Sequence, residues 1–334
     1  MLPGLVRPSF GTAVVLGLIQ AKVEVPPTTA YLLTYRDGKC TANCLFCSQA
    51  RESRSKADLL SRITWPAFQT ETVIKALAKA LESRAVKRVC IQALNYPNVL
   101  EDVIALASAI RGIAEAPISV SCQPLTRREM EKLRDIGVER VSVALDACTE
   151  ELFERIKGRL AGGPYTWNGH WRALRDAVSI FGRGSVTTHL IIGLGERCRD
   201  AVHTIQRCVD AGVYPSLFAF TPIPGTPLEK MSQPPLSYYR AVQLAHNLIT
   251  TGRARYEDMR FDGRGMLVDF GLSWTELRDI IRSGKPFMTS GCPGCNRPYY
   301  NERPSGPIYN YPRPLTREEI DGVEALFRGL LGVG

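Results

Sequence analysis

The chain has 334 residues, 45% of them hydrophobic and 22% charged, which is enough for one barrel-sized globular domain with extensions. Its formal net charge of +9 suits an acidic partner, but the Lys and Arg are dispersed and form no basic block with aromatics, so we do not expect nucleic-acid binding. No apolar run reaches the ~20 residues of a membrane span, and ten cysteines without a secretion signal favour a reducing, cytoplasmic compartment and metal binding.

From residue 28 onward, β-rich runs alternate with segments of helical periodicity. The runs predict strands over residues 28–35, 86–92, 118–121, 140–145, 185–192 and 215–220. Helices are expected between them, for example where Val73, Leu77 and Leu81 recur at helical spacing and where Thr126 and Glu129 form a capping box. Such alternation implies parallel βαβ units. Six units give an α/β fold, a partial (β/α)6 TIM barrel with its chemistry at the carboxyl ends of the strands.

The flanks of this barrel are less regular. We divide the chain into an N-terminal extension (1–27), the barrel (28–230) and a C-terminal extension with a C-x2-C motif (231–334). In the last part we expect a helix over 238–250, a further strand within 253–262, and a final helix capped by Thr316 and Glu319. Residues 285–314 have little regular pattern, and their aromatics and two cysteines favour a functional segment over disorder.

The loop after the first expected strand carries Cys40, Cys44 and Cys47 in the pattern C-x3-C-x2-C. Three thiolates on one tight loop can hold three corners of a [4Fe–4S] cluster and leave one iron open for a ligand. A zinc site would need a second ligand pair, which no nearby Cys or His provides, and a disulfide would leave one cysteine unpaired. Three buried core cysteines remain an alternative, although the preceding Gly38-Lys39 indicates a loop.

With an aromatic residue, Phe46, just before its last cysteine, this loop resembles the signature of the radical S-adenosylmethionine (SAM) enzymes. The resemblance implies that the open iron binds the amino and carboxylate groups of SAM, and that reductive cleavage gives a 5′-deoxyadenosyl radical. The protein orients and shields the cofactors, which carry the chemistry.

A second motif with metal-binding spacing lies in the irregular segment, where Cys292 and Cys295 form a C-x2-C turn. Such a turn can hold a metal or a redox disulfide, and beside a radical SAM loop we interpret it as part of an auxiliary cluster. Two ligands are too few, so Cys90 and Cys122, on the second and third expected strands, are further candidates; the alternative for each is a small buried hydrophobe. Three other cysteines fall on helices or their starts and are expected to be structural: Cys148, Cys198 and Cys208.

Side chains near the strand ends are candidates for holding SAM. Because those ends form the barrel mouth, we expect SAM near Phe46, Asn95, Asp146 and Gly193. Asp146 ends the fourth strand and could bind a hydroxyl or ammonium group of SAM or substrate, which makes it the candidate catalytic residue. The alternative is a charge at a helix N-terminus.

Weaker candidates lie around the same mouth. Gly193 and Gly195 could let the backbone approach an adenine, although a lone G-x-G turn is weak evidence. Arg159 is a candidate clamp for the SAM carboxylate, with a surface arginine as the alternative. His189, in the fifth expected strand, could face the barrel interior.

Over residues 28–230 the chain is similar to the biotin synthase branch of the radical SAM superfamily. The matching stretches are Phe46-Cys47-Ser48-Gln49, Leu145-Asp146, Ile192-Gly193-Leu194-Gly195-Glu196 and Gly225-Thr226-Pro227-Leu228. Cys90 and Cys122 fall where biotin synthases place two ligands of a sacrificial [2Fe–2S] cluster. A third ligand would lie near Thr187, where this chain has no cysteine, and two cysteines are added in the C-terminal extension instead.

That combination resembles the archaeal two-component lipoyl synthases, in which two related radical SAM proteins insert two sulfurs into an octanoyl chain on a protein lysine. The resemblance implies SAM, a [4Fe–4S] cluster, and an auxiliary Fe–S cluster, expected to be [4Fe–4S], as sulfur donor. The implied partners are an octanoylated lipoyl carrier domain, a paralogous second component and an electron donor such as ferredoxin.

Two alternatives stay open. One is a biotin synthase-like sulfurtransferase acting on a free small molecule. The other, of a different class, is a non-catalytic Fe–S carrier or assembly protein, against which the six-strand pattern and the SAM-type motifs speak.

Overall fold

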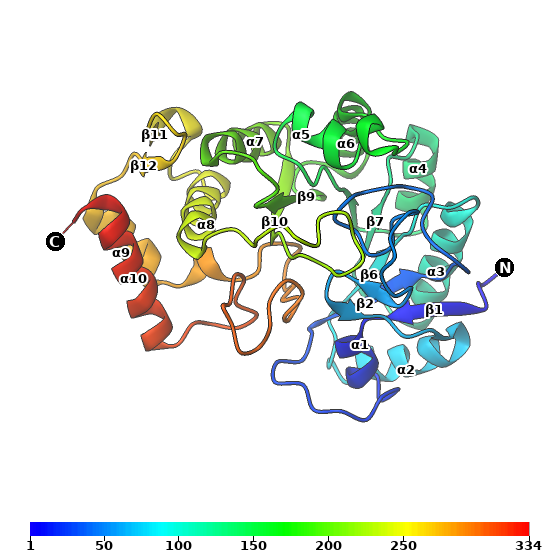
Figure 1. Cartoon of the computed structure of the whole chain (residues 1–334). Coiled ribbons are helices and arrows are strands. Elements are labelled where there is room, and N and C mark those ends of the chain that lie inside the picture. The colour runs from blue at the N-terminus through cyan, green and yellow to red at the C-terminus, as the bar shows by residue number, and fades with distance from the viewer. Residues whose placement is uncertain (334) are drawn as a thin grey trace.

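A computed structural model, which describes residues 1–333, is built around one eight-stranded sheet (Figure 1). The strand order is β10-β9-β8-β7-β6-β2-β1-β5. Neighbouring strands from β2 to β10 pair in parallel. These six are β2 (Thr29–Thr34), β6 (Arg88–Gln92), β7 (Ile118–Cys122), β8 (Arg140–Val143), β9 (Val186–Ile192) and β10 (Val213–Ala219). Each overlaps one predicted run, which confirms the partial (β/α)6 barrel.

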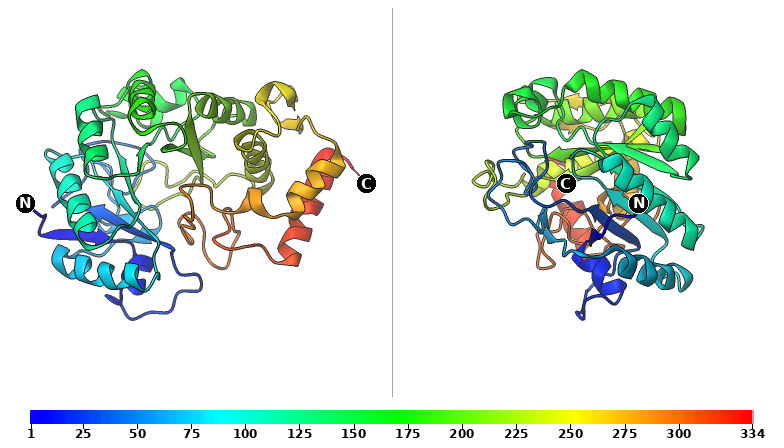
Figure 2. Two further views of the ribbon diagram at one scale, coloured as in Figure 1. Left: turned by 180° about the vertical axis from the view of Figure 1, so that it is seen from behind. Right: turned by 90° about the vertical axis from the view of Figure 1, so that its right-hand side faces the viewer.

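Helices follow these strands and cover the outer face of the sheet, as the view from behind shows (Figure 2). They are α2 (Thr70–Glu82), α3 (Val99–Ile113), α4 (Arg127–Asp135), α5 (Glu150–Ile156), α6 (Trp167–Phe181) and α7 (Cys198–Asp210), with the 3-10 turn η1 (Arg159–Ala161) after α5. Val73 and Leu77 of α2 are buried against the sheet, as their spacing predicts. The capping box of Thr126 and Glu129 opens α4.

The N-terminal extension adds strands that the sequence pattern did not reveal. β1 (Leu5–Pro8) pairs antiparallel with β2 and, on its other side, with β5 (Phe68–Gln69). Two further elements lie in the sequence between β1 and β5. They are α1 (Phe10–Val15), which comes before β2, and a hairpin of β3 (Leu59–Leu60) and β4 (Ile63–Thr64), which comes after it. These strands have only two to four residues, too few to display a period.

The C-terminal extension is mostly helical before its irregular stretch. Its elements are α8 (Leu236–Thr250), η2 (Tyr256–Asp258), β11 (Arg260–Phe261), β12 (Leu267–Asp269), α9 (Trp274–Arg282), η3 (Lys285–Phe287) and α10 (Arg317–Leu331). The strand expected within 253–262 is reduced to β11, which pairs with β12 outside the barrel. The reason is a tight turn in which Asp262 Oδ1 accepts hydrogen bonds from the Arg264 and Met266 amides at 2.8 Å. No helix within residues 1–333 is long and apolar enough to cross a membrane.

The irregular stretch after η3 connects the first and last parallel strands across the open side of the barrel. Ser290 Oγ accepts a hydrogen bond from the Leu217 amide of β10 at 2.8 Å, and Asn296 Oδ1 accepts one from the Thr28 amide beside β2 at 3.0 Å. Two cysteines of the C-terminal extension therefore lie against the barrel interior rather than on a separate tail.

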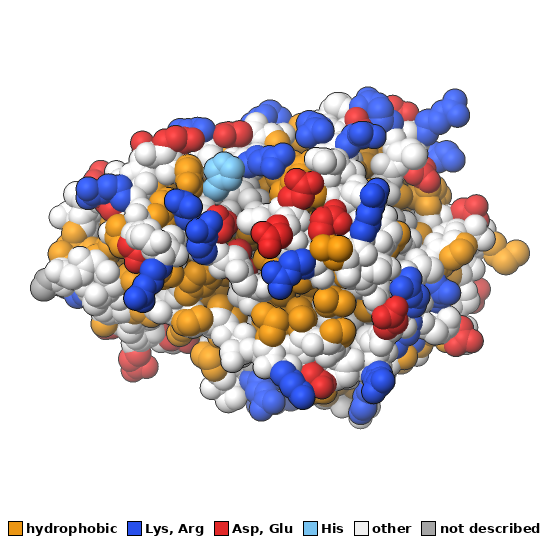
Figure 3. Space-filling view, turned by 45° about the horizontal axis from the view of Figure 1, so that its top comes forward, with side chains coloured by type: hydrophobic (Ala, Val, Ile, Leu, Met, Phe, Trp, Pro, Cys, Tyr) orange, Lys and Arg blue, Asp and Glu red, His pale blue; other side chains and the backbone are white. Residues whose placement is uncertain are grey.

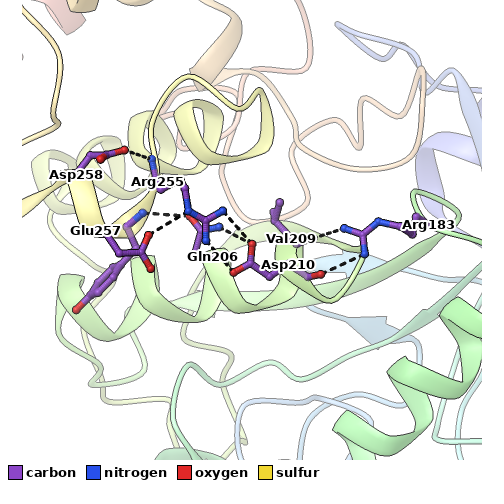
Figure 4. Close-up of polar contacts among 8 residues, drawn as sticks. Arg183, Gln206, Val209, Asp210, Arg255, Glu257 and Asp258 are labelled. Carbon is purple, nitrogen blue, oxygen red and sulfur yellow. Dashed lines mark hydrogen bonds and ion pairs between the residues drawn. The ribbon is translucent and has the colours of Figure 1, made fainter.

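Ion pairs fix the opposite end of the barrel, where strands begin. At the end of α7, Asp210 accepts hydrogen bonds from Arg255 at 3.1 and 3.2 Å, and Arg183 donates to the carbonyls of Val209 and Asp210 (Figure 4). Arg255 also reaches Glu257 at 3.2 Å. These exposed contacts tie the start of the C-terminal extension to the barrel, at the end away from the expected site.

Strand register sorts the inward-facing side chains into two rows. A deep row joins Tyr31, Cys90, Ser119 and Arg140 across β2, β6, β7 and β8. The row above it joins Leu33, Gln92, Ser121, Ser142 and Thr187. Two residues along a strand separate the rows by roughly 6–7 Å.

Candidate functional site

One cavity of about 280 Å³ runs from the carboxyl ends of the strands into the barrel. Both rows of inward-facing side chains line it, together with the loop after β2 and the irregular C-terminal stretch. Six of the seven cysteines proposed from the sequence as metal ligands belong to two groups on its wall. We call Cys40, Cys44 and Cys47 the first thiol group, and Cys90, Cys292 and Cys295 the second thiol group.

Main-chain and lysine contacts hold the loop of the first thiol group in a tight turn. The Cys40 amide donates to the Gln49 carbonyl at 2.9 Å, and the Cys47 amide donates to the Cys44 carbonyl at 2.9 Å. Lys39 Nζ donates to the carbonyls of Ser48 and Ser55, both at 2.7 Å. These contacts bring all three thiols to the cavity wall, as their spacing predicts.

The surroundings of the first thiol group suit thiolate ligands of a cluster. The Asn95 amide donates to Cys40 Sγ at 3.2 Å and the Gln49 amide donates to Cys47 Sγ at 3.4 Å. Burial raises the pKa of Cys44 well above its ordinary value, while the Lys157 cation acts in the opposite direction. Within residues 1–333, no three His, Cys, Asp or Glu side chains are spaced for a single metal ion. The thiolates of a cluster bind different irons and so stand farther apart than the ligands of one ion.

The second thiol group is assembled from distant parts of the chain. Cys295 Sγ lies 3.2 Å from the Tyr31 hydroxyl, and Cys292 Sγ lies 3.5 Å from the Ser119 hydroxyl, so the C-x2-C turn sits over the deep row. Cys90 is a member of that row. Burial raises the pKa of Cys90 strongly, and the neighbouring Cys292 and Cys295 raise it further, which places the three thiols in one electrostatic neighbourhood.

A half-buried arginine accompanies the second thiol group. Arg297 donates to the Ser290 carbonyl at 2.5 Å, and its guanidinium carbon lies 3.8 Å from the centre of the Phe218 ring. It forms no ion pair with a carboxylate within the described part of the chain. Its charge instead lowers the pKa values of Cys90 and Cys295, against the effect of burial. The sequence gave no signal for this residue, because one arginine in an irregular segment has no pattern.

The upper row of side chains and an aromatic residue stand between the two thiol groups. Tyr300 packs edge-on against Trp65 and Phe218, at ring-centre distances of 6.5 and 5.9 Å. Burial raises its pKa strongly, and both Cys47 and Cys90 add to that rise, so Tyr300 lies near both groups. A substrate between the groups would therefore meet this ring and the upper row.

Cys122, the remaining cysteine proposed as a ligand, is not brought into either group. It lies at the end of β7, one residue out of step with the inward-facing Ser119 and Ser121. It borders the cavity and also packs against the core on the helix side of the sheet. Burial raises its pKa to about 12, and the only charged neighbour that contributes is Glu129. The three cysteines expected to be structural are buried: Cys148, Cys198 and Cys208.

Asp146 lines the cavity at the end of β8, and it is paired with a lysine that the sequence interpretation missed. Lys157 Nζ donates to Asp146 Oδ2 at 2.6 Å, with only 6% of the lysine side chain and 10% of the aspartate side chain exposed. The structure gives Asp146 a positive φ of 64°, which carries the carboxylate beyond the strand end. Lys157 also lies 5.4 Å from the centre of the Tyr165 ring, on the cavity wall.

The other residues expected near SAM divide into two sets. Phe46 and Asn95 line the cavity, and Asn95 Nδ2 donates to the Tyr165 hydroxyl at 3.0 Å. Arg159 is exposed on η1, outside the cavity wall, whereas Lys157 two residues earlier lines the cavity beside Asp146. Gly193 and Gly195 have positive φ values of 105° and 117° in a turn beyond the cavity lining.

The turn that contains Gly193 is held by hydrogen bonds to Glu196 and packs against the C-terminal extension. Glu196 accepts hydrogen bonds from the amides of Gly193 and Leu194 at 2.7 and 3.0 Å. A Cβ at Gly193 would lie 2.7 Å from Pro234 Cδ, so this glycine permits a close approach of the C-terminal extension. Direct approach to an adenine stays a prediction for this turn.

His189 faces the barrel interior, as expected from its strand. It lines the cavity, its ring centre is 4.8 Å from that of Phe218, and burial lowers its pKa to about 4. At neutral pH it is therefore an uncharged imidazole.

On the molecular surface, positive and negative side chains are interspersed. The face drawn in Figure 3 shows no continuous basic stripe.

Comparison with known protein families gives one match of wide extent. A model of the radical SAM superfamily matches residues 38–209, more than half of the chain. The match begins just before the first thiol group and ends within α7.

Curated relatives at low identity are biotin synthases. That of Persephonella marina is 26% identical over 208 residues, covering 60% of this chain and 57% of that protein. That of Akkermansia muciniphila is 26% identical over 267 residues, covering 78% and 75%. The chain thus spans less than two thirds of the Persephonella protein's length.

Solved structures share the fold. Methylornithine synthase (PylB) superposes with a TM-score of 0.52 at 17% identity, over 67% of this chain and 63% of that chain. The FeFe-hydrogenase maturase HydG from Carboxydothermus hydrogenoformans gives 0.53 at 16% identity, over 66% and 51%. At this identity the likeness concerns the fold alone.

Proposed function

The chain belongs to the radical SAM superfamily, and we propose that it is a sulfur-inserting member, one component of a two-protein lipoyl synthase acting on octanoyl-lysine of a carrier protein. With clusters and SAM bound, the first thiol group would supply a 5′-deoxyadenosyl radical by reductive cleavage of SAM, and the second would supply sulfur. The supporting observation is that both thiol groups lie on one cavity, separated by a single row of side chains.

Residues around the first thiol group can bind and orient SAM. Asp146 and Lys157 offer a carboxylate and an ammonium of opposite sign within one buried pair, which matches the zwitterionic amino-acid end of SAM. Phe46 and Tyr165 provide aromatic faces on the same wall. Such contacts would hold the reacting groups close, and positioning of this kind can supply ~7–11 kcal/mol of a barrier.

We further propose that the irregular C-terminal stretch helps to exclude water from the space between the groups. Tyr300 lines the cavity, and its carbonyl accepts a hydrogen bond from Ser61 Oγ at 3.1 Å. Thr221 Oγ1 donates to the Asn301 carbonyl at 2.8 Å at the end of β10. Excluding water protects a reactive carbon centre from side reactions.

A second candidate function is favoured by one polar row of the cavity wall, whose lining is otherwise mostly apolar. The upper row contains Gln92, Ser121, Ser142 and Thr187 beside a single aliphatic residue, Leu33. A saturated acyl chain gains little from such polar neighbours, whereas a small polar substrate could hydrogen-bond to them. Together with the similarity to biotin synthases, this supports sulfur insertion into a free small molecule as the alternative.

The partners follow from the proposed reaction. They are an octanoylated lipoyl carrier domain, a paralogous second component and a one-electron donor such as ferredoxin. The auxiliary cluster is part of the proposal, and Cys90, Cys292 and Cys295 are its proposed ligands. A non-catalytic Fe–S carrier is the alternative of another class.

The test is anaerobic reconstitution followed by reduction with SAM and one of three substrates. These are an octanoyl-lysine peptide, free octanamide and a sulfur-free analogue of biotin. The proposal expects 5′-deoxyadenosine with each reaction and a thiolated product from the peptide alone. Thiolation of a free compound instead would support the alternative substrate class, and the absence of 5′-deoxyadenosine would indicate a carrier.

A further inference from the structure

One tyrosine of β2 is held in contact with the second thiol group. Tyr31 is only 6% exposed, and it packs in a small core cluster with Leu33, Trp65 and Leu94. Its hydroxyl oxygen lies 3.2 Å from Cys295 Sγ and 3.1 Å from the Arg297 backbone nitrogen. The packing fixes the ring, so the hydroxyl cannot turn away from both partners.

The direction of these two hydrogen bonds follows from their partners. A backbone N–H can only donate, so the Tyr31 oxygen accepts from Arg297. A cysteine that ligates a metal is a thiolate and can only accept, so with a cluster bound the remaining phenolic hydrogen would be directed at Cys295 Sγ, 3.2 Å away. A chain therefore runs from the Arg297 amide through the Tyr31 hydroxyl to one sulfur.

Within the second thiol group, this contact distinguishes one sulfur from the others. The hydroxyl nearest to Cys292 is that of Ser119, at the longer distance of 3.5 Å. Cys295 thus has the shorter hydroxyl contact, and it shares the neighbouring Arg297 charge with Cys90. Hydrogen bonds to ligating sulfurs are among the factors that set the reduction potential of an iron–sulfur cluster.

We propose that Tyr31 is a positioning residue for the second thiol group, where its hydroxyl donates to the Cys295 sulfur and raises the reduction potential of a cluster bound there. This inference rests on the proposed function only in requiring that the second thiol group hold a cluster. A donor to a thiolate stabilises the more negative, reduced state, so its removal makes the potential more negative.

The experiment compares the wild-type chain with Tyr31→Phe and with Tyr214→Phe, a matched control. Tyr214 lies on β10, and its pKa is raised in part by Cys292 and Cys295, yet its hydroxyl makes no hydrogen bond to sulfur within residues 1–333. Iron and sulfide are counted after anaerobic reconstitution, and the potential of each cluster is measured by redox titration followed by electron paramagnetic resonance.

We expect Tyr31→Phe to keep the iron content, to shift the second cluster's potential in the negative direction and to leave the first cluster unchanged. Tyr214→Phe should match the wild type. A second, isosteric variant carries 3-fluorotyrosine at position 31; this stronger donor should shift the potential in the positive direction, and it tests the inference even if Tyr31→Phe is unstable.

The outcomes separate this inference from the proposed function. Equal potentials in the wild type, Tyr31→Phe and the fluorinated protein overturn the inference about Tyr31 alone. Iron for only one cluster in the wild-type chain overturns both proposals. Opposite shifts in the two variants support the inference even if no thiolated product forms.

Discussion

The two thiol groups share a cavity but are built in different ways. The first lies on a single loop, where main-chain hydrogen bonds set the directions of three nearby thiols. The second joins Cys90 of a barrel strand to Cys292 and Cys295 of a segment far along the chain. A local spacing is therefore enough to recognise the first group, whereas the second exists only once the C-terminal stretch has closed the barrel.

Their electrostatic surroundings differ as well. The first group faces Lys157, which is already paired with Asp146. The second faces Arg297, which has no carboxylate partner in the described part of the chain and lowers the pKa values of Cys90 and Cys295. We interpret the difference as a division of roles, with SAM bound at one group and a sulfur-donating cluster at the other.

The largest expected effect comes from removing the first group. Changing Cys40, Cys44 and Cys47 to Ala should reduce 5′-deoxyadenosine formation to background and lower the iron content by roughly four atoms per chain. Cys208→Ala, a buried cysteine of α7, is the control and should keep both. Continued SAM cleavage by the triple variant would contradict the assignment.

Removing the two C-terminal cysteines of the second thiol group should stop sulfur transfer while SAM cleavage continues. Cys292→Ala with Cys295→Ala should keep 5′-deoxyadenosine formation, lose thiolated product and lose the second cluster, because a cluster without two of its thiolate ligands does not persist. Iron analysis and product mass spectrometry on the soluble variant measure this. Unchanged iron with continued thiolation would show that the turn is structural.

Two single variants test which barrel cysteines are ligands of the second cluster. Cys90→Ala should lower the second-site iron, since Cys90 shares its neighbourhood with Cys292 and Cys295. Cys122→Ala should leave iron unchanged, because no cysteine of either thiol group acts on the pKa of Cys122, although it borders the cavity. Equal iron losses in both variants would mean that the second group includes β7.

The buried pair beside the first group predicts a stability effect. Lys157→Met leaves Asp146 as an unpaired buried charge and should lower the free energy of unfolding by about 3–5 kcal/mol. Adding Asp146→Asn should recover most of that loss while SAM binding stays weak. Urea unfolding and equilibrium SAM binding test this; an additive loss in the double variant would exclude a coupled pair.

The smallest expected effect concerns pH and the C-terminal stretch. Burial raises the pKa of Glu302 to about 7, above roughly 4.3 in the unfolded chain. The folded state therefore binds more protons between these values, and Glu302 contributes stability that is full below about pH 4.3 and declines up to about pH 7. Glu302→Gln should reduce the fall in melting temperature between pH 5 and pH 7. Identical pH profiles would show that Glu302 titrates normally.

The sequence predicts the barrel well because its strands and helices are long enough to show a period. It also identifies the first thiol group, Asp146 and the inward direction of His189, since each sits at a defined place on a parallel strand or its end. It misses Lys157, Tyr31 and Arg297, whose roles depend on contacts between distant segments. The strand register places Cys122 out of step with the inward-facing rows. The sequence of one short strand does not show which of its two faces is turned inward.

The claim that the second thiol group supplies the inserted sulfur can be tested with an isotope. The chain is reconstituted with ³⁴S-sulfide, transferred to buffer containing unlabelled sulfide, and allowed a single turnover with SAM, reductant and the octanoyl-lysine peptide. We predict that the thiolated product carries ³⁴S and that the variant lacking Cys292 and Cys295 forms none. A product with sulfur of natural isotopic abundance would contradict the account.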